Sequence, residues 1–527
     1  MPDLLEISRA RLALGAACAA LLLSACGGGG GGGAATPPPP PPPPPPLPGS
    51  FADTLAYSGG GTASLAAGVE GAAVVPLKIT VGGKTIDYTA TTGHLTATDA
   101  ITGQPAASFF YVAYTAGTLE ASKRPVTFFY NGGPGSASLW LHLGAFGPKR
   151  IVTNIPATAM PAPTQLVDNQ ETLLDHSDLV FVDAIGTGFS QAIAPRTNQA
   201  FWGVDSDAGA FRDFVRRYVT LNGRQASPKY LFGESYGGPR TGVLANLLEV
   251  AGVHLAGVVL QSPVMNYNAN CGVMAPGTLS CEGYIPSYAA VSAYHGRSNP
   301  APADFSAYLQ QAQAFTTSQY APAVNAFLGS GTPAPGAVVS QLVAYTGLSS
   351  NLWTANLSMG PDMYRNNLLT GKMIGRYDAR VNAALGTALT ADGDPSLTVV
   401  NATFVNTVRS YITDELRYTA KSNYASFNDV INSWNFSHDG KQVPDTIPDL
   451  AAAMTINPAL KVVAMSGYYD LATPYHQTEL DLARLGPNPN ILIRNYGSGH
   501  MSYLDNTARQ AQRVDMLALY NSESVAK

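Results

Sequence analysis

The pentapeptide Gly-Glu-Ser-Tyr-Gly at residues 233–237 limits the possible folds of this chain more than any other feature. It follows a short apolar run at residues 230–232, which predicts a strand, and precedes a periodic apolar run at residues 241–250, which predicts a helix. A serine between two glycines on such a turn points its hydroxyl outward, and the following helix N-terminus favours a developing oxyanion. We therefore predict that Ser235 is a nucleophile. An ordinary turn serine is the alternative, because the pentapeptide alone is common.

A serine nucleophile needs a histidine and an acid, and both follow in the chain. The runs at residues 460–466 and 490–495 predict two buried strands; Asp470 follows the first and His500 follows the second. The carboxyl ends of parallel strands meet at one edge of a sheet, where functional groups gather. We predict that His500 accepts the proton of Ser235 and that Asp470 fixes its tautomer. A histidine in a loop is otherwise usually a surface residue.

The remaining patterns indicate an α/β fold with an insertion. Strand-like runs alternate with helical spacing, which implies parallel strand–helix–strand units. The predicted strands are at residues 72–130 (several, with a hairpin turn at 82–83), 179–183, 229–232 and 255–260, and the predicted helices flanking the last two are at 206–221 and 241–250. From residue 265 to 455 the patches are mostly helical, at 304–315, 322–328, 337–345 and 404–418, and 509–520 predicts a closing helix. Insertions of this size between strands often become caps over active sites.

A glycine-rich loop at residues 131–135, Asn-Gly-Gly-Pro-Gly, follows the predicted strand at 126–130. Its backbone N–H groups are suited to an oxyanion. A tight structural turn is the alternative. A phosphate-binding loop of the Walker type is excluded, because no Lys-Ser/Thr follows.

The ordered combination of these motifs resembles the serine carboxypeptidase family, peptidase family S10. The segment Asp-Ala-Ile-Gly-Thr-Gly-Phe-Ser at residues 183–190 is similar to another motif of that family, with Ile185 at its proline position. The resemblance covers roughly residues 70–520 and implies an α/β-hydrolase fold with a mainly helical cap. It also implies that the backbone N–H groups of Gly133 and Tyr236 form the oxyanion hole.

The resemblance further implies how a substrate's C-terminal carboxylate is recognised. In the family an asparagine and a glycine of the first loop take part, together with a glutamate beside the nucleophile; Asn131, Gly132 and Glu234 match them. A second glutamate, shortly before a Gly-Pro pair, shares a proton with the first, but here that position holds Ala145. Carboxylate recognition is therefore expected to be weaker, shifted in pH or lost.

Composition excludes several other functions. The net charge is −5, from 30 Lys and Arg against 35 Asp and Glu, and no basic block occurs, which argues against nucleic-acid binding. The cysteines and histidines have no zinc-ligand spacing, so neither a metal nor a cofactor is expected. Cys271 and Cys281 flank a short loop, and export of the chain favours a disulfide between them over free buried thiols.

The N-terminus indicates export. Arg9 and Arg11 precede a short apolar run that ends Leu-Ser-Ala-Cys at Cys26, which looks like a bacterial lipoprotein signal. Lipid on Cys26 would anchor the chain without spanning a membrane, at the outer membrane or cell surface; a plain signal peptide and a periplasmic or secreted protein are the alternative. Polyglycine and polyproline follow at residues 27–46 and predict a flexible and then stiff tether.

These features divide the chain into five predicted segments. They are a signal peptide (1–26), a tether (27–50), a first part of the hydrolase core (51–264), a helical cap (265–455) and a second part of the core (456–527). The leading functional hypothesis is a serine-type carboxypeptidase that trims peptides through an acyl-enzyme. Because of Ala145, an esterase or acyltransferase on the same machinery is the main alternative, and a surface lipoprotein that only binds is the third.

Overall fold

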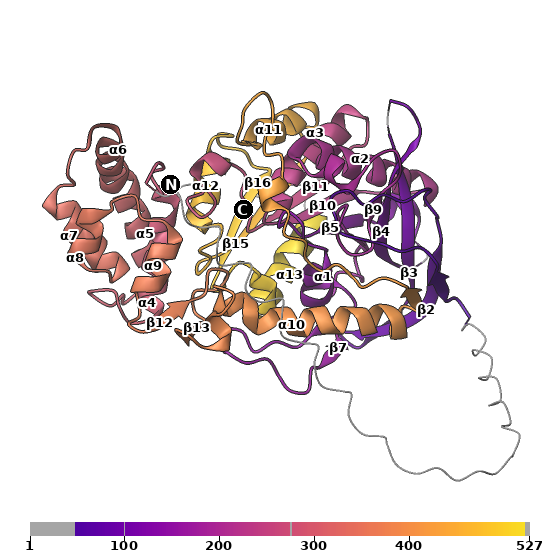
Figure 1. Cartoon of the computed structure of the whole chain (residues 1–527), viewed down its shortest axis with the longest axis horizontal. Helices are drawn as coiled ribbons and strands as arrows, with labels where there is room; N and C mark the ends of the chain where they lie inside the picture. Colours follow the sequence, from indigo (N-terminus) through magenta and orange to yellow (C-terminus); the bar gives the residue numbers. More distant parts are fainter. Residues whose placement is uncertain (1–47, 100, 118, 275–276, 522–527) are drawn as a thin grey trace, which may run out of the picture. The chain divides into compact units, whose positions relative to one another are not determined.

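A ten-stranded mixed sheet forms the centre of the computed structural model, which describes residues 48–99, 101–117, 119–274 and 277–521. Along its main path the strand order is β16-β15-β11-β10-β5-β8-β4-β3-β2, and β9 pairs with β4 (Figure 1). The strands are β2 (Ala72–Val81), β3 (Lys84–Thr98), β4 (Pro105–Ala116), β5 (Val126–Tyr130), β8 (Asp178–Val182), β9 (Gln191–Ala192), β10 (Lys229–Glu234), β11 (Gly257–Gln261), β15 (Lys461–Gly467) and β16 (Ile491–Tyr496). This arrangement confirms the predicted α/β class.

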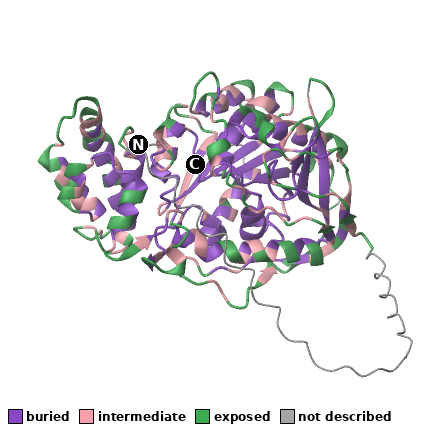
Figure 2. Ribbon diagram, viewed as in Figure 1, coloured by how far each residue is buried: buried purple, intermediate pink, exposed green. Residues whose placement is uncertain are grey.

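The six strands from β16 to β8 are parallel, whereas β4, β3 and β2 continue the sheet antiparallel. Every residue of β5, β8, β10 and β11 is buried, as continuous apolar runs covered on both faces require (Figure 2). Parallel pairing brings the carboxyl ends of β10, β15 and β16 to one edge of the sheet. The motifs that follow these strands are thereby gathered at that edge.

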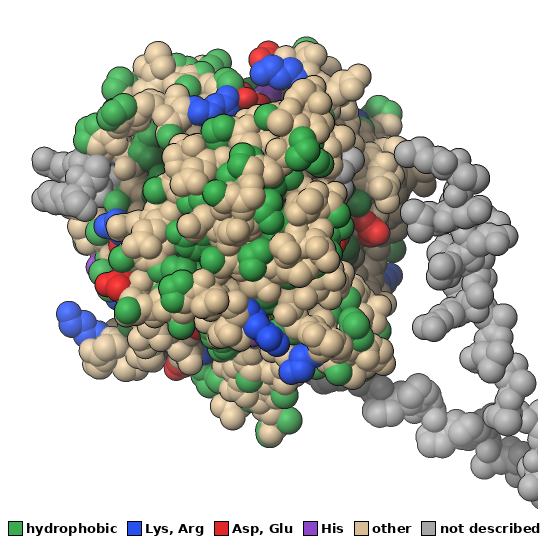
Figure 3. Space-filling view, turned by 90° about the vertical axis from the view of Figure 1, so that its left-hand side faces the viewer, with side chains coloured by type: hydrophobic (Ala, Val, Ile, Leu, Met, Phe, Trp, Pro, Cys, Tyr) green, Lys and Arg blue, Asp and Glu red, His purple; other side chains and the backbone are tan. Residues whose placement is uncertain are grey.

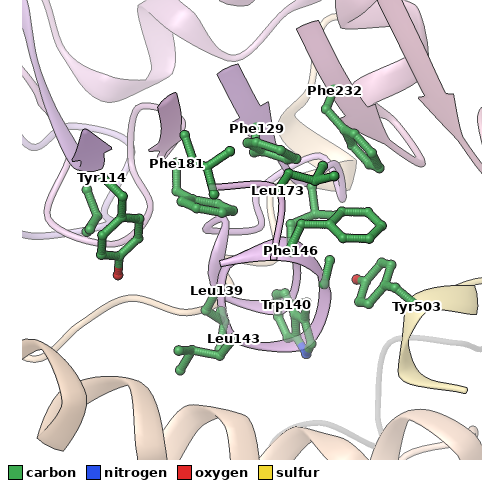
Figure 4. Packing of buried hydrophobic residues seen from close by; sticks show 14 of the residues in the cluster. Tyr114, Phe129, Leu139, Trp140, Leu143, Phe146, Leu173, Phe181, Phe232 and Tyr503 are labelled. Carbon is green, nitrogen blue, oxygen red and sulfur yellow. The ribbon is translucent and has the colours of Figure 1, made fainter. Parts of the chain in front are cut away.

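Two hydrophobic cores lie on the two faces of the sheet, because side chains alternate along a strand. Phe128 belongs to one core and its neighbour Phe129 to the other. The helices α2 (Val204–Leu221), α3 (Gly237–Val250) and α11 (Ile447–Ile456) contribute to the core of Phe128. The helices α1 (Leu139–Leu141), α10 (Pro395–Ser410) and α13 (Asn506–Asn521) contribute to the core of Phe129, part of which is shown in Figure 4.

The insertion lies between the end of β11 at Gln261 and the start of β15 at Lys461, and it has two parts. The first is a helical lobe (residues 285–367) at the left of Figure 1. It contains α4 (Ile285–Tyr294), α5 (Phe305–Phe315), α6 (Ala321–Ser330), α7 (Gly336–Thr346), α8 (Ser350–Ala355) and α9 (Pro361–Asn367). The lobe has its own core around Trp353, and its outer face carries few charged side chains (Figure 3). A disulfide joins Cys271 to Cys281 just before it.

The second part of the insertion, the return segment (residues 372–456), runs back along the sheet. It contains β12 (Lys372–Ile374), β13 (Asn382–Ala384), α10, β14 (Tyr418–Ala420) and α11. β14 pairs with β1 (Phe51–Asp53), and further bridges join Phe427 to Ser136 and Ala425 to Gly188. This part is therefore tied by backbone hydrogen bonds to β1 and to the loops at Ser136 and Gly188.

Several local expectations differ from the structure at their boundaries. The helix predicted from residue 404 begins earlier, at Pro395, because Asp394 caps it by accepting the N–H of Ser396 at 2.9 Å and proline suits a first helical turn. It ends at Ser410, and a π-helical turn (Tyr411–Glu415) follows it. The short strands β6 (Lys149–Ile151), β7 (Leu166–Asp168) and β14 and the helix α12 (Tyr475–Ala483) were not predicted.

The structure does not test the expectations for the N-terminal segments. The signal peptide, the lipid site at Cys26 and nearly all of the tether lie outside the described residues. The five-segment division of the chain stays a prediction. Among the described residues, no helix combines the length and the apolar character that crossing a membrane requires.

Candidate active site

Ser235 lies on a strained turn between β10 and α3. Its backbone φ is +62°, a left-handed conformation that a residue with a side chain adopts only when its surroundings enforce it. A Cβ at Gly233 would stand 2.3 Å from the carbonyl oxygen of Gly237, so glycine is required there. The residue pattern at 233–237 therefore forms the sharp turn that the sequence predicted, with Ser235 lining a cavity of about 120 Å³.

His500 and Asp470 form a buried hydrogen-bonded pair beside this turn. His500 Nδ1 lies 2.7 Å from Asp470 Oδ2, and both side chains are at most 1% exposed. The other carboxylate oxygen, Oδ1, accepts the backbone N–H groups of Ala472 and Thr473 at 2.7 and 3.0 Å. Since the carboxylate accepts, Nδ1 of His500 carries the hydrogen and Nε2 keeps a free lone pair.

The free nitrogen of His500 belongs to the same cavity as Ser235. Nε2 of His500 is buried and has no hydrogen-bond partner among the described residues, and the two residues both line the cavity. Burial would lower the pKa of His500, but the charge and hydrogen bond of Asp470 outweigh it, so the pKa is raised. A histidine poised in this way can take a proton from a neighbouring hydroxyl and stabilise the resulting positive charge.

The loop of His500 is fixed from two sides. Its carbonyl oxygen accepts the hydroxyl of Ser262 at 2.7 Å, and its N–H donates to the carbonyl oxygen of Tyr377 at 2.6 Å. The ring of Tyr377 stands edge-on to the imidazole, with ring centres 4.7 Å apart. Since Tyr377 belongs to the return segment, the insertion contributes directly to the position of the histidine.

The glycine-rich loop lies directly against the turn of Ser235. A Cβ at Gly132 would stand 2.4 Å from the backbone nitrogen of Tyr236, and Gly133 has a φ of +105°. Among the described residues, the backbone N–H groups of Gly133 and Tyr236 have no hydrogen-bond partner. Two unpaired donors beside a serine are the arrangement that stabilises an oxyanion.

Glu234 and Asn131 form a second polar cluster in the cavity. Asn131 Nδ2 donates to Glu234 Oε2 at 2.9 Å, and the hydroxyl of Tyr503 donates to the same oxygen at 2.6 Å. Burial raises the pKa of Glu234 to about 7, against the opposing effects of His500 and the two donors. This cluster changes its charge near neutral pH, and Asn131, Gly132 and Glu234 all line the cavity.

A buried ion pair that sequence reasoning missed supports Asn131. Arg240 is fully buried in α3, bonds Asp207 at 2.6 Å and donates to the carbonyl oxygen of Asn131 at 2.7 Å. Its guanidinium also lies over the rings of Phe211 and Tyr236. An arginine in the predicted helix directly after the nucleophile turn was the available signal, but its partner Asp207 lies on α2, 33 residues away in the sequence.

Two polar segments of the insertion, residues 377–380 and 364–366, lie in different surroundings. Tyr377 lines the cavity, whereas Asp378 pairs with Arg380 at 2.7 Å. Arg380 also bonds Asp505 and the carbonyl oxygen of Gly497, so this pair joins the return segment to the loop of His500. The residues at 364–366 lie away from the cavity; Tyr364 is buried against Tyr288 with ring centres 4.0 Å apart.

The remaining cavity lining is mostly apolar, and it comes from three parts of the chain. The apolar side chains are Trp140 of α1, Leu397 of α10, Phe427 and Met501. Among the described residues, no cluster of His, Cys, Asp and Glu that could hold a metal ion occurs.

Comparison with known proteins identifies relatives of this chain. Residues 82–489 match the family model of the serine carboxypeptidases, a range that contains Ser235 and Asp470. Among solved structures, the chain is similar to Kex1Δp, a prohormone-processing carboxypeptidase of Saccharomyces cerevisiae: 15% identity over 82% of this chain and 91% of that chain, with a TM-score of 0.50.

Other α/β-hydrolases match less well in shape. A proline iminopeptidase of Mycobacterium smegmatis has 15% identity over 85% of this chain and 99% of that chain, with a TM-score of 0.31. A monoglyceride lipase of Saccharomyces cerevisiae has 11% identity over 79% and 92%, with a TM-score of 0.34.

Proposed function

We propose that Ser235, His500 and Asp470 are the catalytic triad of this chain, which belongs to the serine carboxypeptidase family and is a serine hydrolase that acts on peptides. The observation that carries the proposal is the meeting, in one cavity, of a strained serine and a histidine with a free Nε2, whose other ring nitrogen bonds a buried carboxylate.

The reaction follows from this geometry. His500 Nε2 takes the hydroxyl proton of Ser235 as the serine oxygen attacks the carbonyl carbon before the last residue of the peptide. The negative charge on the carbonyl oxygen is stabilised by the N–H groups of Gly133 and Tyr236. His500 then passes the proton to the leaving amine, and water releases the acyl group from Ser235 by the same steps in reverse order.

Recognition of the peptide's free C-terminus is assigned to Asn131, Gly132 and Glu234. Their place beside Ser235 in the cavity supports this role. A protonated Glu234 donates a hydrogen bond to a carboxylate, whereas an ionised Glu234 repels it. Because burial raises the pKa of Glu234 to about 7, we expect free C-termini to be bound better below neutral pH than above it.

The cavity favours an uncharged side chain at the cleavage site. Apart from Glu234 and His500, none of the described lining residues is an acid, a lysine, an arginine or a histidine. Trp140, Leu397 and Phe427 offer apolar surface, so we expect peptides with apolar residues at the cleavage site to be preferred over charged ones.

The location of the protein completes the proposal. Proteins of this family are typically secreted, and the N-terminal pattern supports export. We propose that lipid on Cys26 anchors the enzyme to a membrane surface, and that the glycine- and proline-rich tether separates its folded part from that surface. Metabolic labelling with a palmitate analogue, compared with Cys26→Ser, tests this anchor; an unlabelled wild-type protein would exclude it.

One peptide in three forms tests the activity. The free acid, the C-terminal amide and the methyl ester are incubated with the protein from acid to neutral pH, beside Ser235→Ala, and analysed by mass spectrometry. Stepwise trimming of the free acid that is absent in the variant is the expected result. Cleavage of the ester alone would instead support the esterase or acyltransferase alternative that the alanine at position 145 raises.

A further inference from the structure

Tyr503 takes part in the cluster that faces the substrate's carboxylate, although no sequence motif pointed to it. It lies in a short 3-10 turn, Ser502–Leu504, directly after the loop of His500, and its side chain is fully buried. Its hydroxyl donates to Glu234 Oε2 at 2.6 Å, and Asn131 Nδ2 donates to that same oxygen at 2.9 Å. One oxygen of Glu234 therefore has two donors.

The ring of Tyr503 lies against the turn that carries Ala145. That turn is the π-helical segment His142–Phe146, and a Cβ at Gly144 would stand 3.0 Å from Tyr503 Cε2. Tyr503 and Phe146 belong to the same buried cluster (Figure 4). Near Ala145, where the family resemblance implies a second glutamate, this chain presents a phenol hydroxyl to Glu234.

A phenol and a carboxyl differ in what they do with the shared proton. Burial raises the pKa of Tyr503 well above its usual value, so its hydroxyl stays protonated and remains a donor at every working pH. A second carboxyl would gain or lose a proton in that range. With Tyr503 in place, Glu234 is the group of the pair that titrates.

The two donors decide which oxygen of Glu234 holds the proton. Oε2 already accepts from Asn131 and Tyr503, so a proton there would displace one of these hydrogen bonds. Oε1 has no hydrogen-bond partner among the described residues, and Glu234 lines the cavity. A protonated Glu234 therefore carries its hydrogen on Oε1.

We infer that Tyr503 is a positioning residue for substrate recognition: together with Asn131 it holds Oε2 of Glu234, so that the proton on Oε1 is presented to the peptide's C-terminal carboxylate. The inference rests on the proposed carboxypeptidase function and names a residue which that function did not include. It also assigns the pH dependence of carboxylate binding to one acid.

The surroundings of Glu234 agree with this assignment. The titratable groups that face it are His500 and Asp470 on the loops after β16 and β15, Tyr503 itself, and Tyr377 of the return segment. Burial raises the pKa of Glu234 to about 7, and the hydrogen bond from Tyr503 opposes that rise. Removing the phenol hydroxyl should therefore move the pKa of Glu234 further upward.

Tyr503→Phe is the first test, with the free-acid peptide and its methyl ester as paired substrates. We expect KM for the free acid to rise about tenfold at pH 6, because one of two hydrogen bonds that orient a charged or protonated carboxyl is lost. The decline of kcat/KM for the free acid at alkaline pH should move to higher pH. Values of kcat/KM for the ester should stay within about twofold.

Tyr418→Phe is the matched control. Its hydroxyl donates to Asp53 Oδ2 at 2.7 Å, an oxygen that also accepts from Tyr57 at 2.7 Å, so the same kind of bond is removed outside the cavity. This variant should leave KM for the free acid and its pH dependence unchanged.

Glu234→Gln gives a second, independent readout. The two donors require an acceptor, so the amide oxygen should occupy the place of Oε2 and the amide nitrogen that of Oε1, where it donates to the substrate without titrating. Free-acid cleavage by this variant should therefore lose its alkaline decline. Adding Tyr503→Phe to Glu234→Gln should raise KM again, since the amide loses one of the two groups that orient it.

Two results with Tyr503→Phe would overturn the inference. One is an unchanged KM and pH profile for the free acid. The other is an equal change for ester and free acid, which a purely structural role of Tyr503 would produce. If Tyr503→Phe does not fold, an alkaline decline that persists in Glu234→Gln contradicts the inference. Failure of the proposed function is visible separately, because wild-type protein would then cleave the ester and leave the free acid intact; that result overturns both.

Discussion

The active site contains two buried acids, Asp470 and Glu234, and they are bonded differently. Asp470 accepts hydrogen bonds on both oxygens: Ala472 and Thr473 bond Oδ1, and His500 and the hydroxyl of Thr473 bond Oδ2. Its bonding capacity is used within the protein, so it can only orient and stabilise the histidine.

Glu234 accepts on one oxygen only. Its donors, Asn131 and Tyr503, are both neutral, and burial raises its pKa to about 7. In the proposed mechanism the active site therefore has two parts: a catalytic part, the triad with Asp470, which we call the closed end, and a recognition part, the cluster around Glu234, which we call the open end. Changes at the closed end should affect every substrate, whereas changes at the open end should affect only substrates with a free carboxylate.

Ser235→Ala should have the largest effect. We expect kcat to fall by about 10⁴-fold or more for the free acid and the ester alike, because the nucleophile serves both reactions. Covalent labelling with a fluorophosphonate should disappear in parallel. Persistent labelling would mean that another residue is the nucleophile.

Asp470→Asn should come next, with a fall in kcat of about 10⁴-fold and little change in KM. An amide that donates to Nδ1 would favour the wrong tautomer of His500, with its hydrogen on Nε2. The loss should be equal for both substrates, as measured by steady-state kinetics. A loss confined to the free acid would contradict the division into two ends.

The pH profiles should separate the two ends without any substitution. His500 must be neutral to act as a base, so kcat/KM for the ester should rise with pH through its raised pKa and then level off. For the free acid, ionisation of Glu234 should add a decline above about pH 7, approaching about tenfold per pH unit. Parallel profiles for the two substrates would contradict a role of Glu234 in carboxylate binding.

Replacing both disulfide cysteines by serine should have the smallest effect on activity. The Cys271–Cys281 bridge lies before the helical lobe and does not line the cavity, so kcat and KM should stay within about twofold. The closed loop is short, and its loss should lower the free energy of unfolding by about 2–3 kcal/mol. A lower urea midpoint with unchanged kinetics is the expected result; a changed KM would link the lobe to recognition.

The residues that we propose for the closed end were all pointed to by the sequence. A nucleophilic serine requires a special turn, and this requirement leaves a visible pattern at residues 233–237. Asp470 and His500 follow strands whose apolar runs are equally visible, because strands buried on both faces tolerate few polar residues. The gathering of these residues then follows from parallel pairing.

The open end could be predicted only in part. The sequence pointed to Asn131 and Glu234 through a resemblance, and it marked Ala145 as a departure. It did not point to Tyr503 or Arg240, because neither has a local signature: each acts through a partner more than 100 residues away, on Glu234 and on the carbonyl oxygen of Asn131. The path of the return segment could not be predicted either, because residues 425 and 427 form bridges to residues 188 and 136, which are far away in the sequence.

By itself, then, the sequence determined the α/β class, the positions of the main buried strands along the chain and the choice of Ser235, Asp470 and His500 as the proposed catalytic residues. These depend on local requirements of backbone conformation and burial, which each segment must satisfy with its own residues. The tertiary structure decided the partners of Glu234, the support of Asn131 and the path of the insertion. A hydrogen bond or a packed ring needs only one suitable group at the right point in space, and the chain can supply that group from any part of its length.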